Sequence, residues 1–133
     1  MTTPTSYIRY QAPQVNQRGI NPGIFALANR LGRDGSLSPA DHHWWETTNA
    51  WCDDAYPDPA KSDPTVYDRA INPSAQAWFK SSADHLLEKT EEYLRLVTRY
   101  GLACERLESK NPGRIIYEDP MQVVVIPWSE PAA

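Results

Sequence analysis

Two segments of the sequence carry the side chains best suited to binding or reacting with a small molecule. Lys80 falls in the second turn of a predicted helix, near the positive end of the helix dipole, where a cation is mildly unfavourable. Glu118 and Asp119 put adjacent carboxylates at a tight turn between two predicted strands. These features predict a site where the helix start meets the hairpin. Its candidate residues are Trp78, Lys80, Tyr117, Asp119 and Gln122. The alternative, which the sequence favours, is an ordinary Lys–carboxylate ion pair contributing about 0–1 kcal/mol.

Histidines and carboxylates form no recognisable metal motif. His42 and His43 lie four and three residues before Glu46 on a predicted helix, so one pair could share a face. The next candidate ligand, His85, is on another predicted element, and a metal site needs three or four convergent ligands. The aspartates between 53 and 63 lack the glycine and glutamate that an EF-hand calcium loop requires. We therefore predict no metal and no cofactor.

The sequence contains no recognisable motif for nucleophilic catalysis either. The sequence contains no Gly-x-Ser-x-Gly, and neither Cys52 nor Cys104 stands beside a histidine. The two cysteines also lack the C-x-x-C spacing of redox and metal sites, and no Gly-rich phosphate loop is present. The sequence thus argues against an enzyme, although it leaves open a catalytic site whose residues come together only in the folded chain.

The charge pattern argues against nucleic acid as a partner. The net charge is −4, whereas phosphate binding needs a basic stripe. The charge is uneven: four arginines against one aspartate give residues 1–37 a charge of +3, and seven acids against two bases give residues 38–70 a charge of −5. A nucleic-acid-binding alternative would use the four arginines of the first segment. They are Arg9, Arg18, Arg30 and Arg33.

Helix-start signals recur along the chain, because a capping side chain directly precedes a proline at four places. These are Asn21-Pro22, Ser38-Pro39, Asp63-Pro64 and Asn72-Pro73. With the apolar periodicity, they predict helices over 22–31, 39–56 and 73–100, the third being the longest. Gly32 is expected to stop the first helix in a left-handed conformation. The proline-rich residues 57–72 are expected to be a connection, with one helical turn at most, over residues 63–69.

The C-terminal third reads as strands. Residues 103–109, 114–118 and 123–126 are separated by turn signals, which predicts an antiparallel meander. Pro112 and Gly113 suit the centre of a type II turn. The last strand is entirely apolar, so something should cover both faces: the N-terminal segment or a second copy of the chain. The pattern therefore leaves open a protein partner or a homodimer.

Together these elements predict an α+β fold: three helices, the third the longest, packed on a C-terminal antiparallel sheet of three to four strands. Residues 7–10 could add a strand or lie across the sheet. Residues 1–18 are expected to be extended or partly disordered, 19–128 to form one domain, and 129–133 to be a tail. No signal peptide and no membrane-spanning run is evident, so a cytoplasmic location is expected.

Three segments resemble stretches of small uncharacterised bacterial proteins. They read GIFALANRL, NPSAQAWFK and NPGRIIYEDPMQVVVIP. The resemblance implies a bacterial, single-domain protein and transfers no activity or site. With no enzymatic motif and a surplus of aromatic residues, we expect a non-enzymatic accessory or protein-interaction module. The alternative is a small ligand-binding protein or enzyme with a site near Lys80, Tyr117 and Asp119.

Overall fold

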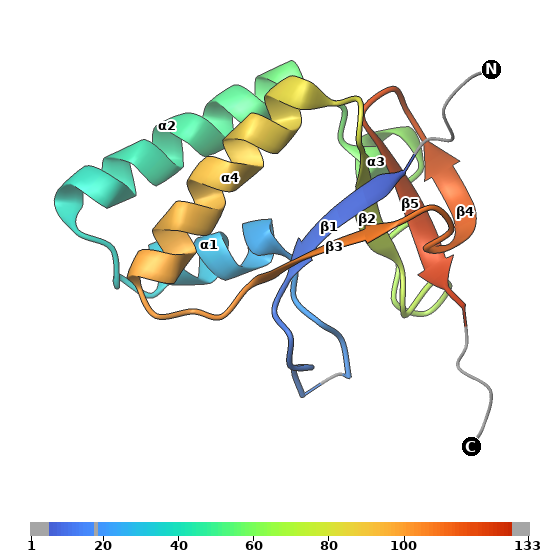
Figure 1. Cartoon of the computed structure of the whole chain (residues 1–133), viewed down its shortest axis with the longest axis horizontal. Helices are drawn as coiled ribbons and strands as arrows, with labels where there is room; N and C mark the ends of the chain where they lie inside the picture. The colour runs from blue at the N-terminus through green and yellow to red at the C-terminus, as the bar shows by residue number, and fades with distance from the viewer. Residues whose placement is uncertain (1–5, 18, 129–133) are drawn as a thin grey trace. The chain divides into compact units, whose positions relative to one another are not determined.

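The computed structural model describes residues 6–17 and 19–128, in which the chain forms four helices and five strands (Figure 1). The strands are β1 (Tyr7–Gln11), β2 (Gln76–Lys80), β3 (Glu105–Ser109), β4 (Gly113–Glu118) and β5 (Gln122–Pro127). The helices are α1 (Ile24–Arg33), α2 (Pro39–Ala55), α3 (Pro59–Ser62) and α4 (Asp84–Arg99). The α+β class is confirmed, whereas the predicted three helices were one too few and the predicted three to four strands were one or two too few. The predicted tail 129–133, residues 1–5 of the predicted extended segment, and Arg18 lie outside the described residues.

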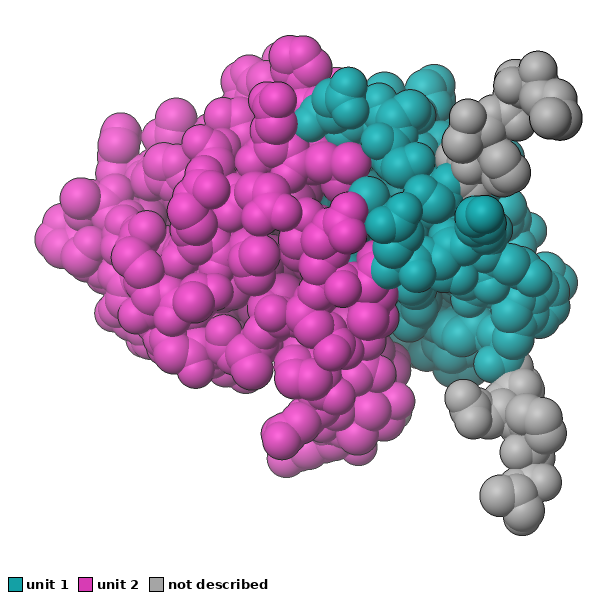
Figure 2. Space-filling view, viewed as in Figure 1, with its two compact units in different colours: residues 1–9, 57–84, 108–133 teal, residues 10–56, 85–107 magenta. Residues whose placement is uncertain are grey.

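The chain divides into two compact units, each made of separate stretches of sequence (Figure 2). Unit 1 comprises Met1–Arg9, Pro57–Asp84 and Glu108–Ala133. Unit 2 comprises Tyr10–Tyr56 and His85–Leu107. Unit 1 holds β2, β4, β5 and α3, and unit 2 holds α1, α2 and nearly all of α4.

The strands form one sheet in the order β3-β1-β2-β5-β4. The pairs β1–β2, β2–β5 and β4–β5 are antiparallel. The predicted meander is wrong, because β3 and β4 lie at opposite edges of the sheet and only β4 and β5 form a hairpin. Strand β3 lies beside β1 instead of β4, and β1 and β2 separate it from the β4–β5 hairpin.

The long helix predicted over 73–100 is wrong in its first third. Residues 76–80 form β2, and the helix begins only at Asp84. Trp78 and Phe79 are both buried, and they lie opposite Val123 and Gln122 of β5. Pairing with β5 therefore overrides the helical periodicity, since aromatic residues fit a half-buried strand well.

Helix α1 buries the predicted stripe, and Ile24 and Leu31 mark its ends. The predicted stop at Gly32 is wrong, because this glycine remains helical. An added Cβ would lie 2.5 Å from ring atoms of Trp45 on α2, so the glycine allows the two helices to approach. The left-handed residue is instead Gly35, with φ +78°.

The predicted start of α2 is confirmed. The Ser38 hydroxyl accepts a hydrogen bond from the Asp41 amide at 3.2 Å, and Pro39 occupies the first helical turn. Helix α4 ends at Arg99, and Gly101 follows in a left-handed conformation (φ +80°). The Leu102 amide then donates to the Val97 carbonyl at 3.0 Å, which satisfies one of the free carbonyls of the last turn.

Strand β5 is the centre of the unit 1 core. Its residues Val123, Val124 and Val125 are all 0% exposed, so both faces of the strand are covered as predicted. This burial is complete within one chain, and a second copy is not required for it. Within the described ranges, no helix combines the length and apolar character needed to cross a bilayer.

Candidate functional site

The β4–β5 turn is organised by the carboxylate of Asp119, which accepts four hydrogen bonds. Its Oδ1 atom accepts from the backbone amides of Met121 (2.8 Å) and Gln122 (3.1 Å). Its Oδ2 atom accepts from the Tyr117 hydroxyl (2.8 Å) and the Gln122 side-chain amide (3.3 Å). The Asp119 amide donates to the Gln122 carbonyl at 3.0 Å, which closes the turn. The structure thus brings together three of the five predicted site residues.

Gln122 joins this turn to a segment that precedes it by more than 60 residues. Its side chain is buried, and the Nε2 atom also donates to the Pro57 carbonyl at 3.1 Å. A buried amide needs such partners, because an unpaired one costs free energy. Loss of hydration, together with the hydrogen bond to Asp119, raises the pKa of Tyr117.

Lys80 pairs with Glu118 and not with Asp119. Its Nζ atom lies 2.6 Å from Glu118 Oε2, and the two side chains are 18% and 51% exposed. The Lys80 amide donates to the Met121 carbonyl at 2.8 Å, so the backbone holds the lysine beside the turn. A pair this exposed contributes about 0–1 kcal/mol, which matches the structural alternative for this lysine.

Trp78 belongs to the core of the sheet. It is 7% exposed, and its indole Nε1 donates to the Gln76 Oε1 atom of the same strand at 2.9 Å. Its ring is therefore not open for stacking on a ligand. As a ligand platform, this residue does not join the cluster of Tyr117, Asp119 and Gln122.

Tyr67 is the neighbour of this turn that the sequence did not reveal. Burial of its phenol oxygen raises the pKa of Tyr67 to about 12; Arg9 lowers it, and carboxylates including Asp58 and Asp119 raise it. Tyr67 lies in the segment predicted to be a mere connection, although the adjacent Val66 is 0% exposed. The apolar residues Val66 and Tyr67 among turn residues were a local signal that this segment packs.

The arginines proposed for nucleic-acid binding do not form a common exposed set. Arg9 is buried on β1, and its Nη1 atom donates to the Ala77 carbonyl of β2 at 2.9 Å. Arg30 and Arg33 are exposed in the last turn of α1. Because Arg9 serves the sheet, this alternative loses one of its four residues.

In unit 2, a chain of polar side chains connects three helices. The Trp45 indole and the Asn49 amide each donate to Asn29 Oδ1 at 3.0 Å. The buried Tyr93 hydroxyl donates to Asn49 Oδ1 and also hydrogen-bonds with Cys52. Burial is the main cause of the raised pKa of both Tyr93 and Cys52, so each stays neutral at pH 7. This network fixes helix positions and leaves Cys52 protonated and unreactive.

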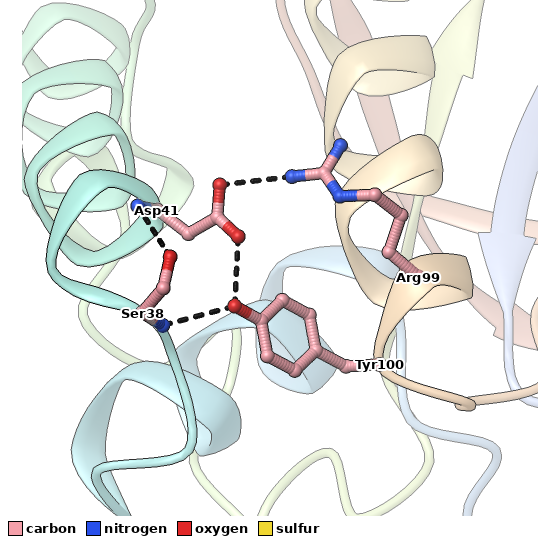
Figure 3. Close-up of polar contacts among 4 residues, drawn as sticks. All are labelled: Ser38, Asp41, Arg99 and Tyr100. Atoms are coloured by element: carbon pink, nitrogen blue, oxygen red, sulfur yellow. Dashed lines mark hydrogen bonds and ion pairs between the residues drawn. The ribbon is translucent and has the colours of Figure 1, made fainter.

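A second polar cluster ties the start of α2 to the end of α4 (Figure 3). The Tyr100 hydroxyl accepts from the Ser38 amide at 2.9 Å and donates to Asp41 Oδ2 at 2.7 Å. Arg99 Nη2 donates to Asp41 Oδ1 at 2.9 Å. The hydrogen bond from Tyr100 first, and the Arg99 pair after it, holds the pKa of Asp41 below its usual value. These contacts are the capping arrangement of a helix start.

No metal ligand set is evident in the part of the chain that the structure describes: no three His, Cys, Asp or Glu side chains converge there. His42 Nε2 does contact Glu46 Oε1 at 2.5 Å, the i, i+4 pair that the sequence indicated. His85 lies on α4.

Several large apolar side chains remain at the surface. In unit 1 they are Tyr67, Ile71, Ile115 and Trp128, which are 41%, 58%, 44% and 56% exposed. In unit 2, Val15 and Trp51 are 60% and 45% exposed. Lys89 Nζ lies 5.1 Å from the centre of the Trp51 ring, which partly covers that tryptophan.

Comparisons with protein-family models, with curated proteins and with solved structures found no match.

Proposed function

We propose that this protein is a non-enzymatic accessory module that binds another protein through unit 1. The proposal is carried by one observation: Ile71 and Trp128, together with Tyr67 and Ile115, expose 41–58% of their surface. Exposed apolar and aromatic side chains are typical of protein interfaces, where their burial supplies most of the binding free energy. Tyrosine and tryptophan are well suited to this role, because each combines a large apolar ring with one polar group.

A second candidate function, a small ligand-binding site near Lys80, Tyr117 and Asp119, has one observation in its favour. Tyr67 and Tyr117 both have raised pKa values beside the Asp119 carboxylate, and perturbed titratable groups tend to gather at functional sites. A ligand would have to compete with the hydrogen bonds that Asp119 already accepts. A compound that raises the melting temperature of the wild type, but not of Lys80→Ala, would support this candidate.

The leading proposal is tested by capture from host lysate with tagged variants of the full chain. Ile71→Ser and Trp128→Ser each remove an exposed apolar side chain from unit 1. Val15→Ser is the matched control, since Val15 is 60% exposed in unit 2. Circular dichroism and the melting temperature check that each variant folds.

The proposal expects a stoichiometric partner that binds the wild type and the Val15→Ser variant but is lost with Ile71→Ser or Trp128→Ser. The apolar contact should also withstand raised salt, because hydrophobic burial is not screened. Recovery of the bare chain, or a partner retained equally by all three variants, would contradict the proposal.

A further inference from the structure

The sheet has two outer strands, β3 and β4, and they differ in how well they are protected against pairing. Strand β3 reads ERLES, and its exposed residues Glu105, Arg106 and Glu108 are all charged. Charged side chains are a common device by which proteins keep an edge strand from pairing with another chain. The charged residues of β3 therefore oppose its pairing with another chain.

Strand β4 reads GRIIYE and has an uncharged centre. Ile115 is 44% exposed, and Ile116 and Tyr117 are half-buried. A ladder shift between Ile115 and Tyr117 marks a bulge, so the pairing with β5 is regular from Gly113 to Ile115 and resumes, shifted, at Tyr117 and Glu118. The bulge shortens the regular edge but leaves an isoleucine at the surface beside it.

The two ends of β4 carry opposite charge. Arg114 lies at its beginning and gives +1. Glu118 and Asp119 lie at its end, where Lys80 reduces their charge of −2 to −1. In an antiparallel pair of identical strands each end meets the other end of its partner, so these charges would attract. A parallel pair would instead bring like charges together.

We propose that β4 pairs antiparallel with β4 of a second copy of this chain, forming a symmetric dimer with one continuous sheet. Such an interface is self-complementary, as a twofold axis requires: the exposed Ile115 of each copy lies near the centre, and the charged ends meet around it. The inference goes beyond the proposed function, because it assigns one edge of unit 1 to a second copy of the chain and not to another protein. The short contact and the bulge predict a weak dimer.

The test measures self-association of the full chain by sedimentation velocity from micromolar to millimolar concentration. Ile115→Lys places a cation at the centre of the edge, the device that natural edge strands use, and should raise the dimer dissociation constant about tenfold or more. Val15→Lys is the matched control, because it introduces a lysine at a more exposed apolar residue that lies outside the sheet and in unit 2. It should leave the dissociation constant unchanged.

Charge reversal provides a second, independent arm. Arg114→Glu should weaken the dimer, and the combined Arg114→Glu/Glu118→Arg variant should regain part of the loss, because the ends again differ in sign. Amide exchange of residues 113–118 should slow as protein concentration rises. Rescue of this kind is not expected if Arg114 acts only on the stability of the single chain.

A wild type that is monomeric throughout the concentration range, or an Ile115→Lys variant that dimerises as well as the wild type, would overturn the inference. A monomeric chain whose captured partner is lost with Ile115→Lys would also overturn it, in favour of a foreign strand on β4. If the chain is monomeric and partner capture depends on Ile71 and Trp128 alone, this inference fails while the proposed function stands.

Discussion

Gly32→Ala is expected to destabilise the protein, although alanine is the better helix former. An alanine Cβ at this position would lie 2.5, 2.5 and 2.6 Å from Cε2, Cζ2 and Cδ2 of Trp45, whereas ordinary contacts are 3.4–4 Å. The ring must therefore move by about 1 Å, and overpacking of this kind costs about 1–3 kcal/mol. Moving it also strains the 3.0 Å hydrogen bond from Trp45 to Asn29, worth about 0.5–1.5 kcal/mol.

The gain in helix propensity opposes this loss but is smaller. Replacing a helical glycine with alanine stabilises by about 0.5–1 kcal/mol. The net expectation is a free energy of unfolding lower by about 1–3 kcal/mol. Urea unfolding followed by far-ultraviolet circular dichroism measures it without relying on the fluorescence of five tryptophans.

The sign of the effect should reverse when Trp45 is truncated. In a Trp45→Ala background the added methyl meets no ring, so Gly32→Ala should stabilise by about 0.5–1 kcal/mol. Ala26→Gly, at an exposed position of α1, is the control that measures the propensity difference alone. If Gly32→Ala stabilises the wild type, or has the same effect in both backgrounds, contact with Trp45 is not the reason for the glycine.

Other polar contacts give expectations that are equally direct. Asp119→Ala should lower the free energy of unfolding by about 1–3 kcal/mol. The control is Asp68→Ala, which removes a carboxylate that accepts a hydrogen bond from the Ala70 amide, and its loss should be smaller. Equal losses in chemical unfolding would contradict the role of Asp119 in the turn. Because the folded state lowers the pKa of Asp41 from 3.8, its contribution is present above that pH and is lost as pH falls through the folded pKa. The difference in melting temperature between the wild type and Asp41→Asn should therefore shrink below about pH 4, and a constant difference would refute this. Because the folded state raises the pKa of Tyr67 from 10.0 to about 12, the free energy of unfolding should fall as pH rises from 10 to 12. An ultraviolet titration of Tyr67→Phe should lack one late-ionising tyrosine. A normal titration of all tyrosines would contradict the burial of the Tyr67 hydroxyl.

The sequence predicted well those elements whose signals are local. The cap at Ser38, the apolar stripe of α1 and the Asp119 turn all depend on residues within a few positions of one another. The same capping signal at Asn72-Pro73 was wrong, because the residues after it pair with β5, more than 40 positions away. A run as short as Trp78-Phe79 fits a helix or a strand equally well, so only the partner strand decides.

Two glycines illustrate the same limit. Gly113 was expected to take a left-handed turn conformation, yet it begins β4, where an added Cβ would lie 2.3 Å from the Ile126 carbonyl oxygen. Gly32 was expected to end a helix and instead admits a tryptophan ring. In each case the sequence predicted that a glycine is needed, but the neighbour that leaves no room for a side chain lies on another element. The same applies to Tyr67, whose place beside Tyr117 depends on a fold that brings two distant segments together.

The hydrogen bonds of Asp119 also bear on whether unit 1 is suited to catalysis or to binding a partner. A carboxylate has about four lone-pair positions, and Asp119 receives four donors from Tyr117, Met121 and Gln122. To take a proton or bind a substrate group, it would have to release one of the bonds that form the β4–β5 turn. Lys80 is likewise held by Glu118 at 2.6 Å. The exposed side chains of Ile71 and Trp128 bear no such constraint, because burying apolar surface yields about 25 cal/mol per Å² without breaking a contact. For the protein-binding function that we propose, the free energy available to a partner of unit 1 is thus mainly apolar, whereas chemistry at Asp119 would first have to break bonds of the turn.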